Sequence, residues 1–170
     1  EGIKNAIRIM KETGVDALKI EGGAEIADTI KGIIHAGIPV MGHLGLTPQS
    51  IHKFGGYGLR AKTESEAKKL MDDALYLEQV GCFGITLEKV PAQLATQVTQ
   101  AVNSATIGIG AGNGTDGQIL VYADMLGLTH EFKPKFLRQY AHLYDTITEA
   151  VGHYVADVKS TDFPNAQESY

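Results

Sequence analysis

The sequence predicts an α/β protein whose strands form a parallel sheet. Short apolar runs alternate along the chain with longer segments in which apolar residues recur at helical spacing. The 20 glycines gather at the ends of these segments, where they suit tight loops. Strands that alternate with helices form βα units, and consecutive units of this kind place their strands parallel.

The first half of the chain contains three predicted helices and two predicted strands. Gly14, Gly37 and Gly81 each follow an apolar periodic segment and are expected to end a helix. The predicted helices run from Ile3 to Gly14, over residues 24–36 and over residues 64–80. The predicted strands are residues 15–21 and 39–44, and residues 47–62 are expected to form a long polar loop.

The second half continues the alternation and then changes character. We predict strands at residues 83–87, 105–109 and 118–122, a helix at 91–102, and a long terminal helix at 136–158. Gly152 is the candidate break point of that last helix, and residues 160–170 are expected to form an extended tail. The length of 170 residues fits one domain, which we place over residues 1–170.

Five βα units are fewer than the eight of a closed barrel, which typically needs about 250 residues. A doubly wound sheet and part of a barrel therefore both remain open. Polar residues at the carboxyl end of strand after strand favour the barrel, because its sites take one group from each of several strands. These residues are Lys19, Glu21, His43, Glu88, Asn113 and Asp116.

Composition excludes several classes of function. A net charge of -5, no tryptophan and no basic stripe argue against nucleic acid as a partner. No apolar run approaches the roughly 20 residues of a membrane span, and no signal peptide is recognised. The lone Cys82 suits a reducing compartment, so we expect a cytoplasmic protein. The chain begins with Glu1-Gly2-Ile3 inside a helical pattern, and we expect its true beginning to lie elsewhere.

Lys19 and Glu21 are two residues apart on one predicted strand, so their side chains point to the same face. A carboxylate there can bind a hard cation, and an ammonium beside it can bind an anionic substrate. The following Gly22-Gly23 lets a ligand approach the backbone. The alternative is a structural ion pair at a strand end.

His43 and Glu88 are the other candidates for chemistry. His43, flanked by Gly42 and Gly45, can donate a hydrogen bond to a substrate oxygen or orient a catalytic group. A buried histidine with satisfied hydrogen bonds is an equally good interpretation. Glu88 leaves an apolar strand and can act as a general base, or it can simply stabilise the start of the next helix.

The glycine-rich stretch at residues 106–118 does not fit a dinucleotide-binding motif. G-x-G-x-x-G would require a glycine where Asn113 stands. The chain also has no cysteine and histidine cluster with zinc spacing and no Ser-His-Asp set. A single carboxylate is short of a magnesium site, which uses one or two carboxylates together with substrate oxygens.

Several motifs taken together resemble the ketopantoate hydroxymethyltransferase family. They are KIEGG at 19–23, GHLGLTPQS at 42–50, FGGY at 54–57, LEKVP at 87–91, IGIGAGNGTDGQILV at 107–121 and KPKF at 133–136. The resemblance spans essentially the whole chain, and the combination is specific where no single motif is. It implies a TIM-type (βα)8 barrel, of which this chain covers about the last five βα units plus the C-terminal helices. The family's earlier strands, with two Mg²⁺-binding aspartates and a substrate-binding serine, precede the matched region.

The resemblance also implies an activity and roles for four residues. The family transfers a hydroxymethyl group from 5,10-methylenetetrahydrofolate to 3-methyl-2-oxobutanoate, giving ketopantoate for pantothenate and coenzyme A synthesis, through an enolate stabilised by Mg²⁺. By this resemblance Lys19 binds substrate, Glu21 belongs to the metal site, Glu88 accepts the proton and His43 is catalytic. The family also forms large homo-oligomers.

Two alternatives to this function stay open. The chain can be a non-catalytic fragment that needs the missing strands or partner chains to form a site. An oxo-acid lyase on a similar barrel is the other.

Overall fold

A computed structural model describes residues 1–170, which form two compact units, Glu1–Ile119 and Leu120–Tyr170. The prediction of one domain over residues 1–170, with an extended tail, therefore stays a prediction.

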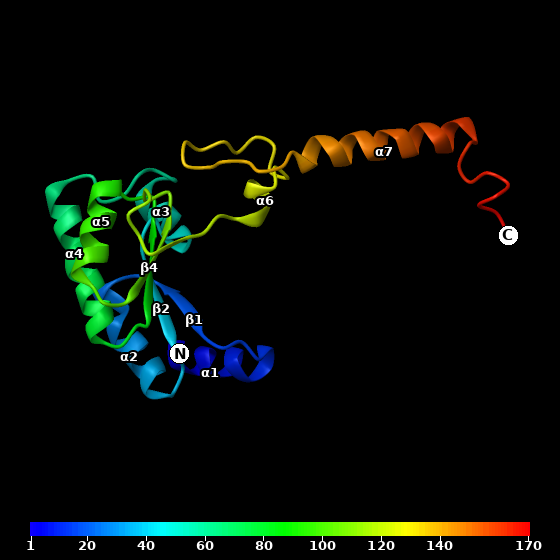
Figure 1. Ribbon diagram of the computed structural model, residues 1–170. Coiled ribbons are helices and arrows are strands. Elements are labelled where there is room, and N and C mark those ends of the chain that lie inside the picture. The colour runs from blue at the N-terminus through cyan, green and yellow to red at the C-terminus, as the bar shows by residue number, and fades with distance from the viewer. The chain divides into compact units, whose positions relative to one another are not determined.

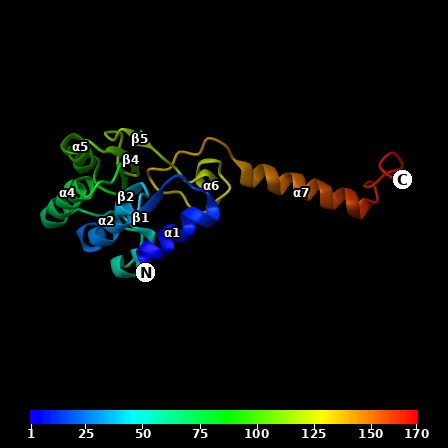
Figure 2. The same ribbon diagram turned by 90° about the horizontal axis from the view of Figure 1, so that it is seen from below.

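The first unit is built on a five-stranded parallel sheet whose strands follow the order of the sequence. The strands are β1 (Leu18–Glu21), β2 (Val40–Gly45), β3 (Gly84–Glu88), β4 (Ala105–Ile109) and β5 (Gly117–Gln118). The connecting helices α2 (Ala27–His35), α4 (Glu64–Gln79) and α5 (Ala92–Ala101) lie on the same side of the sheet (Figures 1 and 2). A doubly wound sheet reverses its strand order and carries helices on both faces, whereas a barrel does neither. The predicted α/β fold of barrel type is therefore confirmed.

The core lies between the sheet and these helices. One face of β1, β2 and β3 supplies apolar side chains to it, and the helices supply the facing stripe. Leu77 of α4 lies so close to β2 that a Cβ added at Gly42 would stand 2.7 Å from its Cδ1. Fully burying such an aliphatic side chain contributes about 1.5–3 kcal/mol. Among the largest fully buried side chains of this core are Ile30, Ile33, Val40, Leu77, Ile85, Leu87 and Val98.

Local sequence explains where the helices begin and how they pack. Thr63 caps α4 by accepting a hydrogen bond from the Glu66 amide, and the Glu66 carboxylate accepts one from the Thr63 amide, which forms a capping box. Helix α1 (Gly2–Thr13) packs on α2 with Ile3 directly over Gly32. Two short 3₁₀ turns, η1 (Ala24–Ile26) and η2 (Pro48–Ser50), follow β1 and β2, and η2 leads into the short α3 (Ile51–Phe54).

The predicted strand at residues 15–21 is too long at its start. β1 begins only at Leu18, whose amide donates to the carbonyl of Pro39, and Val15 is exposed. The strand begins there because its partner β2 begins at Val40, opposite Leu18. An apolar run is therefore a strand only over the length that its neighbour can pair.

The predictions for the C-terminal third need two corrections. The strand expected at residues 118–122 is confined to Gly117–Gln118, and Tyr122–Met125 forms the short helix α6 instead. The helix expected at 136–158 is α7, Leu143–Ser160, and it runs through Gly152 without a break. Its start is late because the preceding segment bonds to α6: the Tyr140 amide donates to the carbonyl of Met125.

The second unit exposes an apolar stripe along α7, which we call the α7 stripe. Its members recur at intervals of three and four residues, so they share one side of the helix. They are Tyr144, Ile147, Val151, Tyr154, Val155 and Val158, all well exposed. None of the helices combines the length and apolar character that crossing a bilayer requires.

Candidate active site

Three adjacent strands deliver charged side chains to the face of the sheet that the helices leave uncovered. Glu21 of β1 lies opposite His43 of β2, and Gly45 of β2 lies opposite Glu88 of β3. Side chains alternate between the two faces along a strand, so Lys19 shares the face of Glu21. All four predicted site residues therefore meet at the carboxyl ends of these strands.

His43 is the centre of the cluster and is only 2% exposed. Its Nδ1 lies 3.1 Å from Nζ of Lys19 and 3.7 Å from Oε1 of Glu21. Its Nε2 lies 3.2 Å from Oε2 of Glu88. The imidazole thus stands between an ammonium and a carboxylate on one side and a second carboxylate on the other.

The partners of His43 indicate which ring nitrogen carries the proton. A lysine ammonium only donates hydrogen bonds, so Nδ1 accepts from Lys19 and the proton of the neutral ring is on Nε2. Nε2 lies within ion-pair distance of Glu88 but without hydrogen-bond alignment, and it is the one buried side-chain nitrogen or oxygen without a hydrogen-bond partner. A buried N–H in this state is available to a ligand or to a small movement of Glu88.

The carboxylate of Glu21 is held by Gln49 from the loop after β2. The Gln49 amide donates to Oε2 at 3.1 Å, and its side chain donates to the Glu21 carbonyl, also at 3.1 Å. The next amide, that of Gly22, donates to the carbonyl of His43 at 3.1 Å. Oε1 of Glu21 is thereby left free of hydrogen bonds and faces the imidazole.

Glu88 is positioned by a close approach of two strand ends. Gly45 has φ +90°, and a Cβ there would stand 2.2 Å from the carbonyl oxygen of Glu88. That carbonyl accepts a hydrogen bond from the Leu46 amide at 2.8 Å. Only glycine fits this conformation and this spacing, so Gly45 brings β2 and β3 together where Glu88 meets His43.

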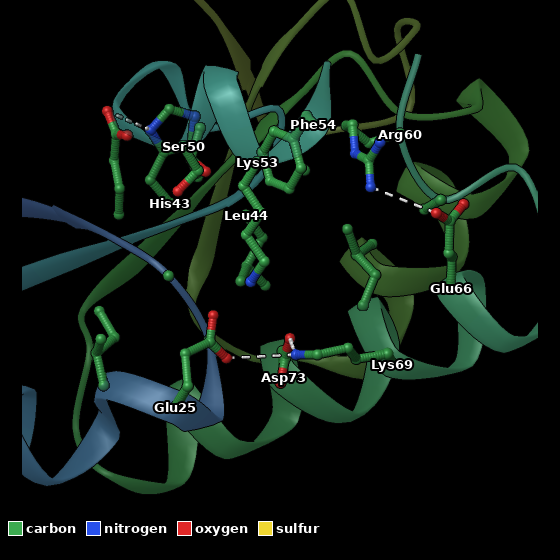
Figure 3. A pocket seen from close by; sticks show the side chains of 18 of the residues that line it. Glu25, His43, Leu44, Ser50, Lys53, Phe54, Arg60, Glu66, Lys69 and Asp73 are labelled. Carbon is green, nitrogen blue, oxygen red and sulfur yellow. Dashed lines mark hydrogen bonds and ion pairs between the residues drawn. The ribbon is translucent and has the colours of Figure 1, made fainter. Parts of the chain in front are cut away.

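A pocket of about 440 Å³ borders the cluster (Figure 3). Its lining includes Glu21 and His43 but neither Lys19 nor Glu88, so it adjoins the charged cluster without containing it. We place the site at the cluster, because all four charged groups converge there. In Figure 3, His43 lies on one side of the pocket, and the Arg60–Glu66 ion pair, 3.3 Å long, lies on the other.

A second charged group closes the pocket beneath the loop after β1. Lys69 of α4 lies 2.5 Å from Oδ2 of Asp73 and 3.4 Å from Oε2 of Glu25 (Figure 3). Burial alone would lower the pKa of Lys69, but its hydrogen bond to Asp73 and the two nearby carboxylates raise it. Burial would raise the pKa of Glu25, yet backbone hydrogen bonds from Glu25 and Gly23 and the charge of Lys69 lower it.

Two of the polar residues predicted at strand ends do not join the site. The carboxylate of Asp116 accepts hydrogen bonds from the amide and hydroxyl of Thr106, at 2.8 and 2.9 Å, and these bonds lower its pKa. Thr106 belongs to the opposite face of β4, since its register partner is Ile85 rather than a residue of the charged face. Asp116 therefore braces the glycine-rich loop, and Asn113 is exposed in that loop.

Sequence reasoning missed Gln49 and Asp73. Gln49 carried no local signal, because its contacts reach 28 residues back to Glu21. Asp73 did carry one: it interrupts the apolar stripe of α4 between Leu70 and Leu77, with Lys69 four residues before it. An acid on an apolar stripe, preceded by a lysine one turn earlier, indicates a buried carboxylate paired with that lysine.

The side chains do not assemble a complete metal centre. No group of three or more His, Cys, Asp or Glu residues is placed to hold a metal ion. In the cluster, Oε1 of Glu21 accepts no hydrogen bond and is free to bind a cation. Mg²⁺ is commonly held by one or two carboxylates together with water and substrate oxygens, so Glu21 can supply part of such a site and not the whole.

Comparisons with known proteins agree with the motifs. The sequence model of the family described as ketopantoate hydroxymethyltransferase matches residues 1–166. The chain is 61% identical over 170 residues to the 3-methyl-2-oxobutanoate hydroxymethyltransferases of Flavobacterium johnsoniae and Christiangramia forsetii, and 59% identical to that of Bacteroides fragilis. Each alignment covers all of this chain and 62% of the relative, so the chain spans less than two thirds of these proteins' length.

Proposed function

We propose that the charged cluster is part of the active site of a transferase, because this chain belongs to the ketopantoate hydroxymethyltransferase family. The reaction is the transfer of a hydroxymethyl group from 5,10-methylenetetrahydrofolate to 3-methyl-2-oxobutanoate, giving ketopantoate for pantothenate biosynthesis. The observation that carries the proposal is the convergence of Lys19, Glu21 and Glu88 on the buried His43 at the carboxyl ends of parallel strands. A free thiol at Cys82 suits a cytoplasmic location, which we also propose.

Glu88 is the proposed general base. A hydrogen at C3 of a 2-oxo acid lies next to the carbonyl, so removing it forms an enolate that can attack a one-carbon donor. Oε2 of Glu88 faces Nε2 of His43, which leaves Oε1 to accept the C3 proton. In the tautomer that Lys19 imposes, Nε2 of His43 carries the proton and lies 3.2 Å from Oε2 of Glu88, so a small movement of Glu88 would let this N–H orient the carboxylate.

Lys19 and Glu21 are the proposed substrate and metal residues. The Lys19 ammonium can pair with the substrate carboxylate, at the same edge of the sheet as the base. Oε1 of Glu21 can supply one ligand to Mg²⁺, with the other ligands coming from outside this cluster. Mg²⁺, when bound, supplies positive charge that stabilises negative charge developing on substrate oxygens.

Proton–deuterium exchange at C3 of 3-methyl-2-oxobutanoate, followed by NMR, tests the role of Glu88 without the folate. Loss of a general base typically costs 10²–10⁴-fold, so Glu88→Gln is expected to slow exchange by about that factor. Glu12→Gln is the matched control, because Glu12 is an exposed residue of α1 paired only with Arg8 at 3.9 Å. Equal exchange in the two variants, at a rate above the background without protein, would remove Glu88 from the base role.

A second candidate function is supported by the edges of the sheet. β1 and β5 each pair on one side only, and the cluster lacks a full set of metal ligands. The chain is then non-catalytic alone and forms a site only with further strands or with partner chains. Exchange measured on this chain and on a chimera, in which the unmatched part of the Flavobacterium johnsoniae relative is added, separates the two candidates. Exchange by the chain alone contradicts the second, and exchange by the chimera alone supports it.

We further propose that the protein forms a large homo-oligomer. The α7 stripe supports this, because six well-exposed apolar side chains share one side of an 18-residue helix. Exposed apolar surface of this extent commonly marks a contact between proteins.

A further inference from the structure

Asp73 is an acidic residue in an apolar position. It lies in the middle of α4 on the side that packs against the sheet and η1, and it is 7% exposed. Its neighbours on that side are Leu70, Ala74 and Leu77, all buried. Burying a carboxylate is costly unless each oxygen is bound, so the contacts of Asp73 indicate what it does.

Both oxygens of Asp73 are bound, and one of them holds the loop after β1. Oδ1 accepts a hydrogen bond from the Ala24 amide at 3.1 Å, and Oδ2 accepts one from Lys69 at 2.5 Å. The carboxyl group lies directly against Gly23, where an added Cβ would stand 2.3 Å from Cγ of Asp73. Lys69 in turn reaches Glu25 on the same loop (Figure 3).

This loop is continuous with the active cluster. Gly22 and Gly23 separate Ala24 from Glu21, and paired glycines have the greatest backbone freedom of any dipeptide. The loop is fixed on the sheet side by Gln49 and by the carbonyl of His43. Asp73 fixes its other side through the Ala24 amide, so the two glycines are held between two anchors.

We propose that Asp73 is a positioning residue for Glu21, acting from α4 through Gly23 and Ala24. The inference rests on the proposed function only in assigning Glu21 to the reacting site. Asp73 itself touches none of Lys19, His43 and Glu88, and its hydrogen bonds go to Ala24 and Lys69.

The first test compares two neighbouring aspartates. Asp73→Asn keeps the shape of the side chain but places an amide N–H₂ against the Lys69 ammonium. Asp72→Asn is the matched control, because Asp72 accepts from Lys68 at 2.6 Å with the same spacing on the same helix, but with both side chains exposed. In the chimera described above, Asp73→Asn is expected to lower kcat for C3 exchange at least ten-fold, whereas Asp72→Asn leaves it unchanged.

A double-mutant cycle distinguishes positioning from a general loss of stability. If Asp73 acts through Glu21, Asp73→Asn has no further effect on kcat once Glu21→Gln is present. If Asp73 only stabilises the fold, its effect multiplies that of Glu21→Gln, and the inference is overturned. Equal kcat in Asp73→Asn and Asp72→Asn overturns it as well.

A second measurement separates this inference from the proposed function. Oε1 of Glu21 lies 3.7 Å from Nδ1 of His43, so movement of Glu21 is expected to shift the ¹⁵N resonance of that nitrogen. The shift should occur in Asp73→Asn and not in Asp72→Asn, even if the wild-type protein exchanges no C3 protons. If C3 exchange is absent but the resonance shifts, the enolisation role is refuted and the positioning role is supported. If C3 exchange occurs but the resonance does not shift, the enolisation role is supported and the positioning role is refuted.

If the Asp73→Asn variant does not fold, Lys69→Met tests the same inference. Lys69 is mostly exposed, so its loss perturbs the core little while freeing Oδ2 of Asp73. A smaller fall in kcat, again absent when Glu21→Gln is present, supports the inference. Unchanged kcat and an unchanged His43 resonance contradict it.

Discussion

Replacing Gly45 by alanine should uncouple Glu88 from His43. The new Cβ would stand 2.2 Å from the carbonyl oxygen of Glu88, and real Cβ contacts essentially never fall below 3.0 Å. The end of β2 or of β3 must therefore move by at least 0.8 Å. The same Cβ would also stand 2.7 Å from Cγ1 of Val90, which makes a second clash. A misplacement of about 1 Å can cost about 10²-fold in rate, so we expect C3 exchange to fall by about that factor.

Stability should fall as well, for two separable reasons. At φ +90° a side chain costs about 1–3 kcal/mol in backbone strain, and overpacking against Glu88 and Val90 adds about 1–3 kcal/mol. Gly37→Ala isolates the first term, because Gly37 has φ +86° and nothing within 4 Å of an added Cβ. We expect Gly37→Ala to lower the free energy of unfolding by the strain alone and to leave exchange unchanged.

Urea denaturation followed by circular dichroism gives the two stabilities, and NMR gives the exchange rates in the chimera. The reasoning is refuted if Gly45→Ala exchanges C3 protons as fast as Gly37→Ala. Contact between the ends of β2 and β3 would then not position the base.

Three further predictions concern other parts of the molecule. Burial would raise the pKa of Glu78, but hydrogen bonds from the amides of Ser104 and Asn103 lower it below its ordinary value of 4.5. Its contribution to the free energy of unfolding is therefore present above pH 4.5 and lost as the pH falls through the lowered pKa. Glu78→Gln should lower the free energy of unfolding at neutral pH and progressively less in acid, as urea denaturation across pH will show. Burial raises the pKa of Cys82 to about 11, outweighing the backbone hydrogen bond from Gly42. A thiol reagent at pH 8 should therefore label Cys82 slowly in the native chain and rapidly in urea. Fast labelling of the native chain would contradict this burial. Ile147→Lys with Val151→Lys should shift the protein to smaller species in size-exclusion chromatography, because it places charge on the α7 stripe, while Glu149→Lys, on the other side of α7, should not.

The spacing of apolar residues along the chain was enough to predict several strands and helices. The apolar run at residues 105–109 became β4 without change, and α4 and α5 each lie within a residue of their predicted ends. The same spacing could not show how far a neighbouring strand or segment pairs with an element. β1 lost its first residues because β2 begins opposite Leu18, and α7 begins late because Tyr140 bonds to Met125.

The candidate site divides in the same way. Lys19, Glu21, His43 and Glu88 were predicted to share one edge because parallel strands end together, and the structure brings them together; their roles stay predictions. Gln49 and Asp73 could not be assigned in the same manner, because their partners are distant in the sequence. Gln49 binds Glu21, 28 residues away, and Asp73 binds Ala24, 49 residues away. Asp116 was misplaced because the sequence does not say on which face of β4 the returning loop binds.

The four residues are divided between neighbouring strands. Lys19 and Glu21 share β1, whereas His43 and Glu88 belong to β2 and β3. The pair proposed to hold the ligand and the pair proposed to move the proton therefore stand on different strands of one sheet. Because β2 and β3 are paired with each other, a displacement of β1 relative to β2 would change the distance between the two pairs and leave His43 and Glu88 in register.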